Sequence, residues 1–314
     1  MKYDLYFHND FDGRVSAAVF LDFLRLRGDS VANYFAVDHY IRPQWDAMVK
    51  KSKNSVVIFD FYYHPKAEYF FDHHLTTFIR PDWEKKFKRT KYLNLNFKYE
   101  SCCHLVYEVL VKKFGYKPVK HIKDLVKWAD VVDAAKYKSA KDTIDLKEPA
   151  LQIDSYLDQK SHDGDPIRWM IEELSRKDLV KVAKDKRVVA VVKVVRAKIT
   201  KSLAYHRKNL QVFDKVCFID LSAGQVERVR FAPHFLVPSL SYIVTMLRSG
   251  KVFRVAVGAN PWKLNLHKHD LRKLVREKYG FKAGGHARAA GITGIKDKKA
   301  AMKIVNELIE ILNK

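Results

Sequence analysis

The sequence has few cysteines and no long apolar run. Of its 314 residues only three are cysteines, and Cys102 and Cys103 are adjacent while Cys217 lies far away. This spacing is typical neither of a disulfide framework nor of a zinc site, and it fits a reducing cytoplasm. No segment approaches the roughly 18 apolar residues of a membrane span, and the N-terminus lacks the apolar run of a signal peptide. We therefore expect a soluble cytoplasmic protein that is not exported.

Acidic residues are scarce relative to basic ones. The chain has 59 Lys and Arg residues against 36 Asp and Glu residues, which gives a formal net charge of +23. A protein with this charge attracts polyanions in a salt-dependent way, so nucleic acid is the obvious partner. A lysine-rich composition that only maintains solubility is the alternative explanation. Because 47% of the residues are hydrophobic, the chain can bury a substantial core, and its length allows two domains.

Short apolar strands alternate with helical patterns over the first part of the chain. The patterns predict strands at 3–7, 32–37, 55–61 and 69–71, and helices at 15–26, 44–50, 101–114 and 123–135. Strands that alternate with helices indicate an α/β fold in which a parallel sheet has helices on both faces. Ligands of such sheets bind beyond the carboxyl ends of the strands.

A basic segment separates this N-terminal domain, residues 1–176, from a second domain. The segment 177–208 contains a valine-rich centre that would suit a buried strand, but its length and its lack of Gly and Pro favour a helical linker. The second domain, residues 209–314, is predicted to be a smaller α/β domain. Its pattern predicts strands at 216–221, 239–247, 252–257 and 263–267, and helices at 270–278 and 297–312.

Carboxylates and imidazoles follow several of the predicted strands. They occur in His8-Asn9-Asp10-Phe11-Asp12-Gly13, at Asp60, in Asp72-His73-His74 and at Asp130. These side chains are the ligands that hold a pair of hard divalent cations, a site typical of phosphate ester hydrolysis. The two oxygens of Asp60 suit a bridge between ions about 3.5 to 4 Å apart. A helix N-cap is the structural alternative for Asp10 or Asp12 taken alone.

These motifs resemble those of the DHH phosphoesterase superfamily, which is named after the triplet seen here at Asp72, His73 and His74. The superfamily includes RecJ-like exonucleases, nano-RNA phosphodiesterases and cyclic dinucleotide phosphodiesterases. The segment 283–291, Ala-Gly-Gly-His-Ala-Arg-Ala-Ala-Gly, is similar to the glycine-rich signature of the DHH-associated C-terminal domain. The resemblance therefore covers both halves of the chain, and it implies a metal-binding N-terminal domain and a substrate-binding C-terminal domain.

The resemblance also implies a role for each site residue. One Mn²⁺ would be held by His8, Asp10 and Asp60, and a second by Asp12, Asp60, His73 and Asp130, with Mg²⁺ or Co²⁺ as alternative metals. Asp72 would orient the histidines, and His74 would contact the scissile phosphate or protonate the leaving oxygen. Asp133 lies one helical turn from Asp130 and is an alternative ligand.

In the second domain the resemblance implies that substrate contacts come from Gly284, Gly285, His286 and Arg288. One departure from the family pattern concerns the segment after the preceding strand, where many relatives carry an arginine. This chain has Gly258-Ala259-Asn260-Pro261-Trp262 instead. Trp262 is predicted either to stack on a base or to pack in the core.

The motifs and the charge together predict a manganese-dependent phosphodiesterase. We expect it to degrade short single-stranded RNA or DNA, oligoribonucleotides in particular, to nucleoside monophosphates. A single-stranded DNA exonuclease, a cyclic dinucleotide phosphodiesterase and a 3′-phosphoadenosine 5′-phosphate phosphatase are alternatives. A nucleic-acid-binding protein without catalytic activity is an interpretation from a different class. No membrane partner is expected, and a homodimer is compatible with the sequence.

Overall fold

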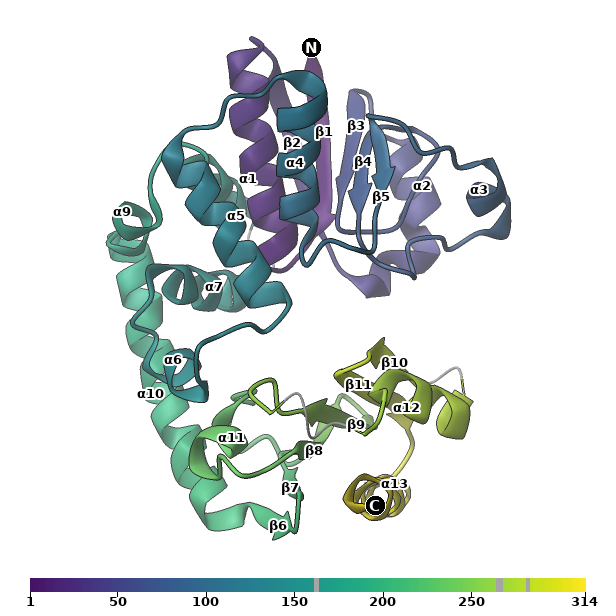
Figure 1. Ribbon diagram of the computed structural model, residues 1–314, viewed down its shortest axis with the longest axis vertical. Coiled ribbons are helices and arrows are strands. Elements are labelled where there is room, and N and C mark those ends of the chain that lie inside the picture. The colour runs from purple at the N-terminus through teal and green to yellow at the C-terminus, as the bar shows by residue number, and fades with distance from the viewer. Residues whose placement is uncertain (161–163, 264–267, 281–282) are drawn as a thin grey trace. The chain divides into compact units, whose positions relative to one another are not determined.

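The chain forms two compact units (Figure 1). The computed structural model describes residues 1–160, 164–263, 268–280 and 283–314. The first unit comprises Met1–Lys136 and Lys147–Val192, and the second comprises Tyr137–Leu146 and Lys193–Lys314. Most of the strand predicted at 263–267 lies outside the described residues. Within the described residues, every helix is too short or too polar to cross a membrane.

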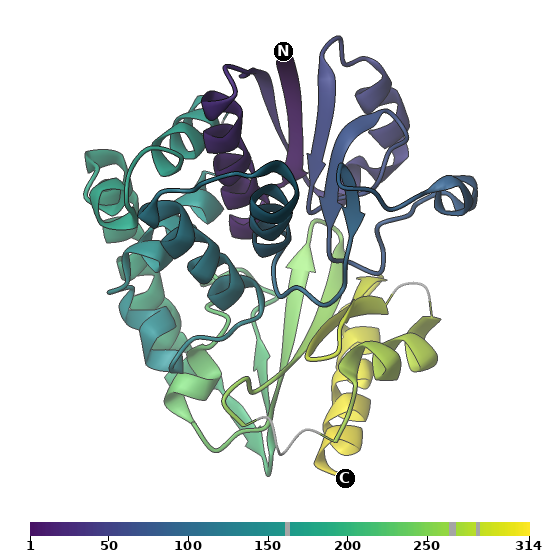
Figure 2. The same cartoon turned by 45° about the horizontal axis from the view of Figure 1, so that its top comes forward.

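A five-stranded parallel sheet forms the centre of the first unit, as the sequence predicts. The strands are arranged in the order β2-β1-β3-β4-β5, and each pairs in parallel with its neighbour. Figure 2 shows these purple and blue strands side by side. Their bounds are β1 Lys2–His8, β2 Ser30–Val37, β3 Ser55–Phe59, β4 Ala67–Asp72 and β5 Leu93–Leu95. The sequence pattern misses β5 because three residues show no periodicity.

Alternating side chains of the central strands supply two separate cores. Leu5 and Phe7 of β1 belong to the larger core, whereas Tyr6 between them packs with Trp45 on the opposite face. Both faces of the sheet are therefore covered by helices, as predicted for a parallel sheet. The helices of the larger core are α1 Phe11–Leu26, α4 Cys102–Phe114, α5 Lys120–Asp133, α7 Pro149–Gln159, α8 Gly164–Leu174 and α9 Leu179–Ala183. The opposite face carries η1 His39–Gln44, α2 Trp45–Lys50 and α3 Pro81–Lys86.

The basic segment forms the helix α10, Lys186–Asn209, which confirms the preference for a helix over a strand. The residues Val188, Val192, Ile199 and Leu203 are buried, and this spacing places them on one side of a helix. Val189 and Val194 are exposed. A strand would have buried every second valine, and this is not the observed pattern.

The second unit contains a six-stranded mixed sheet in the order β10-β11-β9-β8-β7-β6. Only β7 and β8 pair in parallel, and the other neighbours are antiparallel. The strands are β6 Gln211–Phe213, β7 Val216–Asp220, β8 Tyr242–Ser249, β9 Val252–Ala259, β10 Ala283–His286 and β11 Ala289–Ile295. The helices are α6 Ala140–Asp145, α11 Ala232–Leu236, α12 Leu271–Tyr279 and α13 Lys298–Asn313. Core side chains of α12 and α13 pack on one face of this sheet, and Figures 1 and 2 show α13 in yellow beside its strands.

Candidate metal centre

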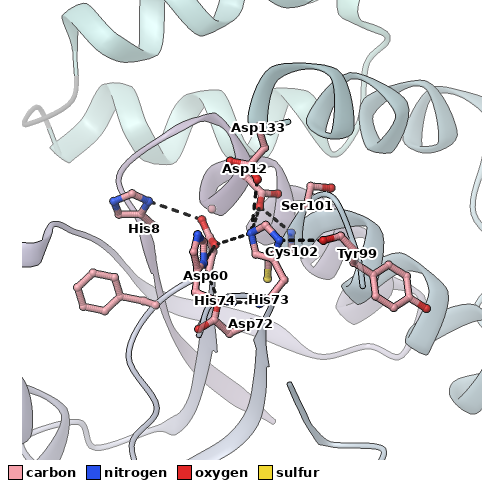
Figure 3. A network of polar contacts seen from close by, with 12 residues as sticks. His8, Asp12, Asp60, Asp72, His73, His74, Tyr99, Ser101, Cys102 and Asp133 are labelled. Carbon is pink, nitrogen blue, oxygen red and sulfur yellow. Dashed lines mark hydrogen bonds and ion pairs between the residues drawn. The ribbon is translucent and has the colours of Figure 1, made fainter. Parts of the chain in front are cut away.

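The predicted ligands of the first unit meet at the carboxyl ends of three neighbouring strands. His8 ends β1, Asp60 follows β3, and Asp72 ends β4 immediately before His73. Parallel pairing of these strands brings their ends to one edge of the sheet, so residues remote in sequence become neighbours. Figure 3 shows their side chains gathered around Asp60.

Asp60 lies at the centre of the cluster, and its carboxylate is buried. Its oxygens lie 3.6 Å from Nδ1 of His8, 3.5 Å from Nε2 of His73 and 3.1 Å from Nδ1 of His74. Neither oxygen has a hydrogen-bond partner among the described residues, and the same holds for Nε2 of His73. A buried carboxylate in this state is costly unless a cation compensates it. The residue adopts a left-handed backbone with φ of 56°, which aspartate tolerates better than most side chains.

Carboxylates and imidazoles at this edge form three groups that could each hold a cation. One group contains His8, Asp10 and Asp60, a second contains Asp60, His73 and His74, and a third contains Asp12, His73 and Asp133. Since Asp60 and His73 each belong to two of these groups, the groups form one continuous site. Such sharing is the arrangement that a pair of divalent cations requires.

The pKa values of His8, His73 and His74 are raised by the carboxylates that surround them. Burial opposes their protonation, but the neighbouring carboxylates outweigh it. As a result the pKa of His8 is raised to about 11, mainly by Asp10, and that of His73 to about 10, mainly by Asp60. The pKa of His74 is raised to about 12, again against burial, by Asp60 and Asp72. In the absence of a metal, protons on these rings therefore balance the carboxylates.

Two carboxyl groups of the cluster resist ionisation. Burial and then the charge of Asp60 raise the pKa of Asp12 well above its usual value, and the same causes raise the pKa of Asp133 to about 7. The pKa of Asp60 shifts in the opposite direction: burial would raise it, but the positive charge of His74 and the close approach of His73 and His8 hold it well below its usual range. An excess of buried carboxylates around a shared centre is the electrostatic condition that favours cation binding.

Further contacts fix the orientation of the ligands. Nδ1 of His73 lies 3.1 Å from the carbonyl oxygen of Tyr99, so its Nε2 faces the carboxylates. Asp72 accepts hydrogen bonds from the backbone N–H groups of His73 at 2.7 Å and His74 at 3.1 Å, and it lies 2.9 Å from Nδ1 of His74. The orienting role of Asp72 stays a prediction, and these are the contacts through which it would act.

Asp12 is held by the first turn of α4. The backbone N–H groups of Cys102 and Cys103 donate to its two oxygens at 2.6 and 2.9 Å. Both cysteines are buried free thiols. Their contact with Asp12 is made by backbone N–H groups, which are unpaired donors in the first turn of a helix, and not by their sulfur atoms. Ser101 caps this helix by accepting from the N–H of His104 at 3.2 Å. The sequence predicts a helix at 101–114, whereas the contact with Asp12 carried no sequence signal.

Asp10 combines the two roles that the sequence left as alternatives. It is the N-cap of α1 and accepts from the N–H of Gly13 at 3.0 Å. Its second oxygen lies 2.6 Å from Nδ1 of His8. One carboxylate thus starts the helix and also belongs to a group able to hold a cation.

The structure separates Asp130 from the cluster and places Asp133 in it. Asp130 accepts from the hydroxyl of Ser101 at 2.6 Å, and its other oxygen lies 2.8 Å from Nδ1 of His104. Asp133 lies one turn later on α5, 3.5 Å from Nε2 of His73. The motif resemblance pointed to Asp130, but both of its oxygens are engaged elsewhere.

Gly13 is required by the close approach of α1 to β1. A Cβ atom on this residue would lie 2.2 Å from the carbonyl oxygen and 2.7 Å from the nitrogen of His8. We expect Gly13→Ala to destabilise the fold by on the order of 3 kcal/mol and to displace His8, because backbone atoms must move. Urea unfolding measures the loss. The control is Gly164→Ala, where nothing lies within 4 Å of the added Cβ; equal stability of the two variants would contradict the prediction.

The predicted contacts of the second unit lie around the β10–β11 hairpin. Gly285 has φ of 139°, and a Cβ there would meet the Ala289 carbonyl oxygen at 2.3 Å, so the hairpin itself requires this glycine. Space around a Cβ on Gly284 is open. Arg288 is exposed, and the side chain of His286 lies outside the described part of the chain. Trp262 is half-buried; its Nε1 donates to the Tyr137 carbonyl oxygen at 2.7 Å, and its ring packs against Phe231. The choice between a core role and stacking on a base stays open.

No protein-family model matches the sequence, and no curated protein matches it. Solved structures do resemble this chain. The pGpG-specific phosphodiesterase PggH of Vibrio cholerae has a TM-score of 0.72 at 18% identity, covering 99% of each chain. The DHH domain of a member of the s1p family of ribosomal proteins has a TM-score of 0.54 at 15% identity, covering 98% of this chain and 86% of that one. RecJ of Thermus thermophilus with Mn²⁺ has a TM-score of 0.56 at 14% identity, covering 99% of this chain and 51% of RecJ. At these identities the resemblance concerns the fold.

Proposed function

Since the chain has the fold of DHH-domain proteins, we propose that it is a metal-dependent phosphodiesterase. Its substrates would be short single-stranded nucleic acids, oligoribonucleotides in particular, which it would hydrolyse to nucleoside monophosphates. The observation that carries this proposal is the buried Asp60 carboxylate, whose two oxygens face histidines of two adjoining ligand groups. A basic chain of net charge +23 adds attraction for an anionic substrate.

The donor set fits a pair of divalent cations. His8, Asp10 and Asp60 would hold one, and Asp12, Asp60, His73 and Asp133 the other. Oxygen and imidazole donors suit Mn²⁺, and Mg²⁺ or Co²⁺ are alternatives. When bound, such a pair supplies polarisation of a phosphate oxygen and activation of a water molecule.

The chain itself contributes orientation and charge. Asp72 lies 2.9 Å from Nδ1 of His74 and orients its ring. In the metal-free protein, Asp60 and Asp72 raise the pKa of His74 to about 12 against the effect of burial. A protonated imidazole at the edge of the site provides a donor for an anionic phosphate or for the leaving oxygen. The side chain of His74 is 27% exposed, so it is accessible to a ligand.

A short linear substrate is supported by the comparison with PggH. The name of that protein describes a phosphodiesterase specific for pGpG, which is a linear dinucleotide, and the similarity extends over 99% of both chains. RecJ is about twice as long as the part that this chain matches. We therefore rank dinucleotides ahead of long single strands as substrates.

Hydrolysis of a substrate panel tests the proposal. The panel comprises a 5′-phosphorylated dinucleotide, RNA and DNA oligonucleotides of about ten residues, a cyclic dinucleotide and 3′-phosphoadenosine 5′-phosphate, each with Mn²⁺, with Mg²⁺ and with chelator. We expect the 5′-phosphorylated dinucleotide to be cleaved fastest, and only with a metal present. Faster cleavage of the cyclic dinucleotide or of the long DNA would overturn the substrate assignment. Absence of hydrolysis throughout the panel would support the non-catalytic interpretation.

A further inference from the structure

A pocket of about 570 Å³ lies at the amino ends of the parallel strands in the first unit. Residues at the starts of β1, β4 and β5 line it, together with the residue after α1 and the last residue of α4. Figure 1 marks the N-terminus at this end of β1. The metal centre lies at the carboxyl ends of the same strands, roughly 20 Å away along a strand of this length. The volume is within the range of small-ligand pockets, about 300 to 1000 Å³.

Three aromatic side chains that line the pocket contact one another. The ring of Tyr92 meets Tyr69 and Phe114 edge-on, with centroids 5.4 Å away in both cases. Tyr69 is buried, whereas Tyr92 is 39% exposed. The neighbouring rings therefore hold Tyr92 in place while part of its surface faces solvent. An exposed aromatic ring of this kind is a stacking surface for a nucleobase.

Glu68 brings a carboxylate without a cation to the pocket. It is the second residue of β4 and is half-buried, and its Oε1 accepts from the hydroxyl of Tyr3 at 3.5 Å. In the part of the chain that the structure describes, Glu68 forms no ion pair. An ionised carboxylate can only accept hydrogen bonds, so a ligand group at this position has to be a donor.

Positive charge at the pocket comes from Lys91 and Arg27. Arg27 is engaged by the protein, because its Nε lies 3.3 Å from Asp29 and its Nη1 donates to the Tyr69 hydroxyl at 3.3 Å. Lys91 is exposed, and its Nζ lies 5.0 Å from the ring centroid of Tyr92. Of the two cations, Lys91 is the one available to an anionic group of a ligand. Both disfavour a ligand that is itself a cation.

An aromatic ring, a carboxylate and a lysine in one pocket suit a nucleotide, and the carboxylate selects the base. Guanine carries two adjacent donors, N1–H and N2–H, on one edge, whereas adenine and cytosine place an acceptor nitrogen beside their amino group. A carboxylate accepts from both guanine donors but repels that ring nitrogen. We propose that this pocket binds a guanine mononucleotide, with Glu68 at the base edge, Tyr92 at the base plane and Lys91 at the phosphate. This site does not depend on the proposed hydrolytic function.

Calorimetry with guanosine monophosphate (GMP) and adenosine monophosphate (AMP), titrated into the full chain in chelator, tests the site. We expect the wild type to bind GMP about tenfold more tightly than AMP, and Glu68→Gln to remove this preference. Tyr92→Ala should weaken the binding of both nucleotides about tenfold. The matched control is Glu84→Gln, which changes an exposed carboxylate of α3 that does not line the pocket. Its GMP affinity should stay within about twofold of wild type.

Asp60→Asn separates the pocket from the metal centre. In chelator this variant should bind GMP as tightly as the wild type, because the pocket lies at the other edge of the sheet. Loss of GMP binding in Asp60→Asn would place the nucleotide at the metal centre and overturn the proposal. Equal affinities of the wild type for GMP and AMP, or a GMP preference that survives in Glu68→Gln, would also overturn it. If Glu68→Gln does not fold, unchanged nucleotide binding in Tyr92→Ala has the same consequence.

Discussion

Replacement of Asp60 with asparagine is expected to reduce metal-dependent turnover by roughly 10³-fold or more. The carboxylate is the only group shared by His8, His73 and His74 within 4 Å among the described residues. An amide of the same shape removes the negative charge that both ligand groups use. Asparagine also tolerates the left-handed backbone at φ of 56°, so the substitution leaves the chain geometry in place.

Thermal unfolding separates loss of the metal site from loss of the fold. A cation that binds only the folded wild type at 100 times its Kd stabilises it by about 2.7 kcal/mol. Added Mn²⁺ should therefore raise the Tm of the wild type but not that of Asp60→Asn. The matched control is Asp46→Asn, which removes a carboxylate 3.0 Å from Nε2 of the buried His64, outside the cluster. Near-normal turnover of Asp60→Asn would contradict the role of this residue.

The sequence predicts the first unit better than the second for a physical reason. Parallel strands are buried on both faces and read as short continuous apolar runs, as in Val56 to Phe59. Their carboxyl ends share one edge, so the polar residues that follow them can be assigned to a site before any coordinates are known. In the second unit most neighbours pair antiparallel, and their register depends on local backbone features such as the positive φ of Gly285 within β10, which single-sequence patterns do not reveal.

The details of the site that escaped the sequence depend on contacts between distant elements. Asp12 binds the backbone of Cys102 and Cys103, about ninety residues away, through amides that every residue type except proline possesses. Patterns identify which residues carry chemistry, whereas tertiary packing decides which of two similar residues is used.

Asp130 and Asp133 are such a pair. Replacing Asp133 with asparagine should reduce turnover strongly, whereas the same change at Asp130 should affect turnover much less. We expect Asp133→Asn to reduce turnover by roughly 10²-fold or more, because its carboxylate faces Nε2 of His73 at 3.5 Å. Asp130→Asn should keep turnover within roughly tenfold of wild type, since it acts through Ser101 and His104 rather than through the cluster.

In the metal-free protein the order reverses: Asp130→Asn should lose stability, whereas Asp133→Asn should not. Asp130→Asn removes one charged acceptor from two hydrogen bonds, which should cost about 1 to 3 kcal/mol of unfolding free energy. Asp133 has its pKa raised to about 7 by burial and the charge of Asp60. A carboxyl group whose folded pKa exceeds its unfolded value lowers stability as pH rises from about 4. At pH 7 Asp133→Asn relieves this repulsion, so its urea midpoint should equal or exceed that of wild type. If Asp130→Asn instead abolished turnover while Asp133→Asn remained active, Asp130 would be the ligand, and the metal would have to draw it away from Ser101 and His104.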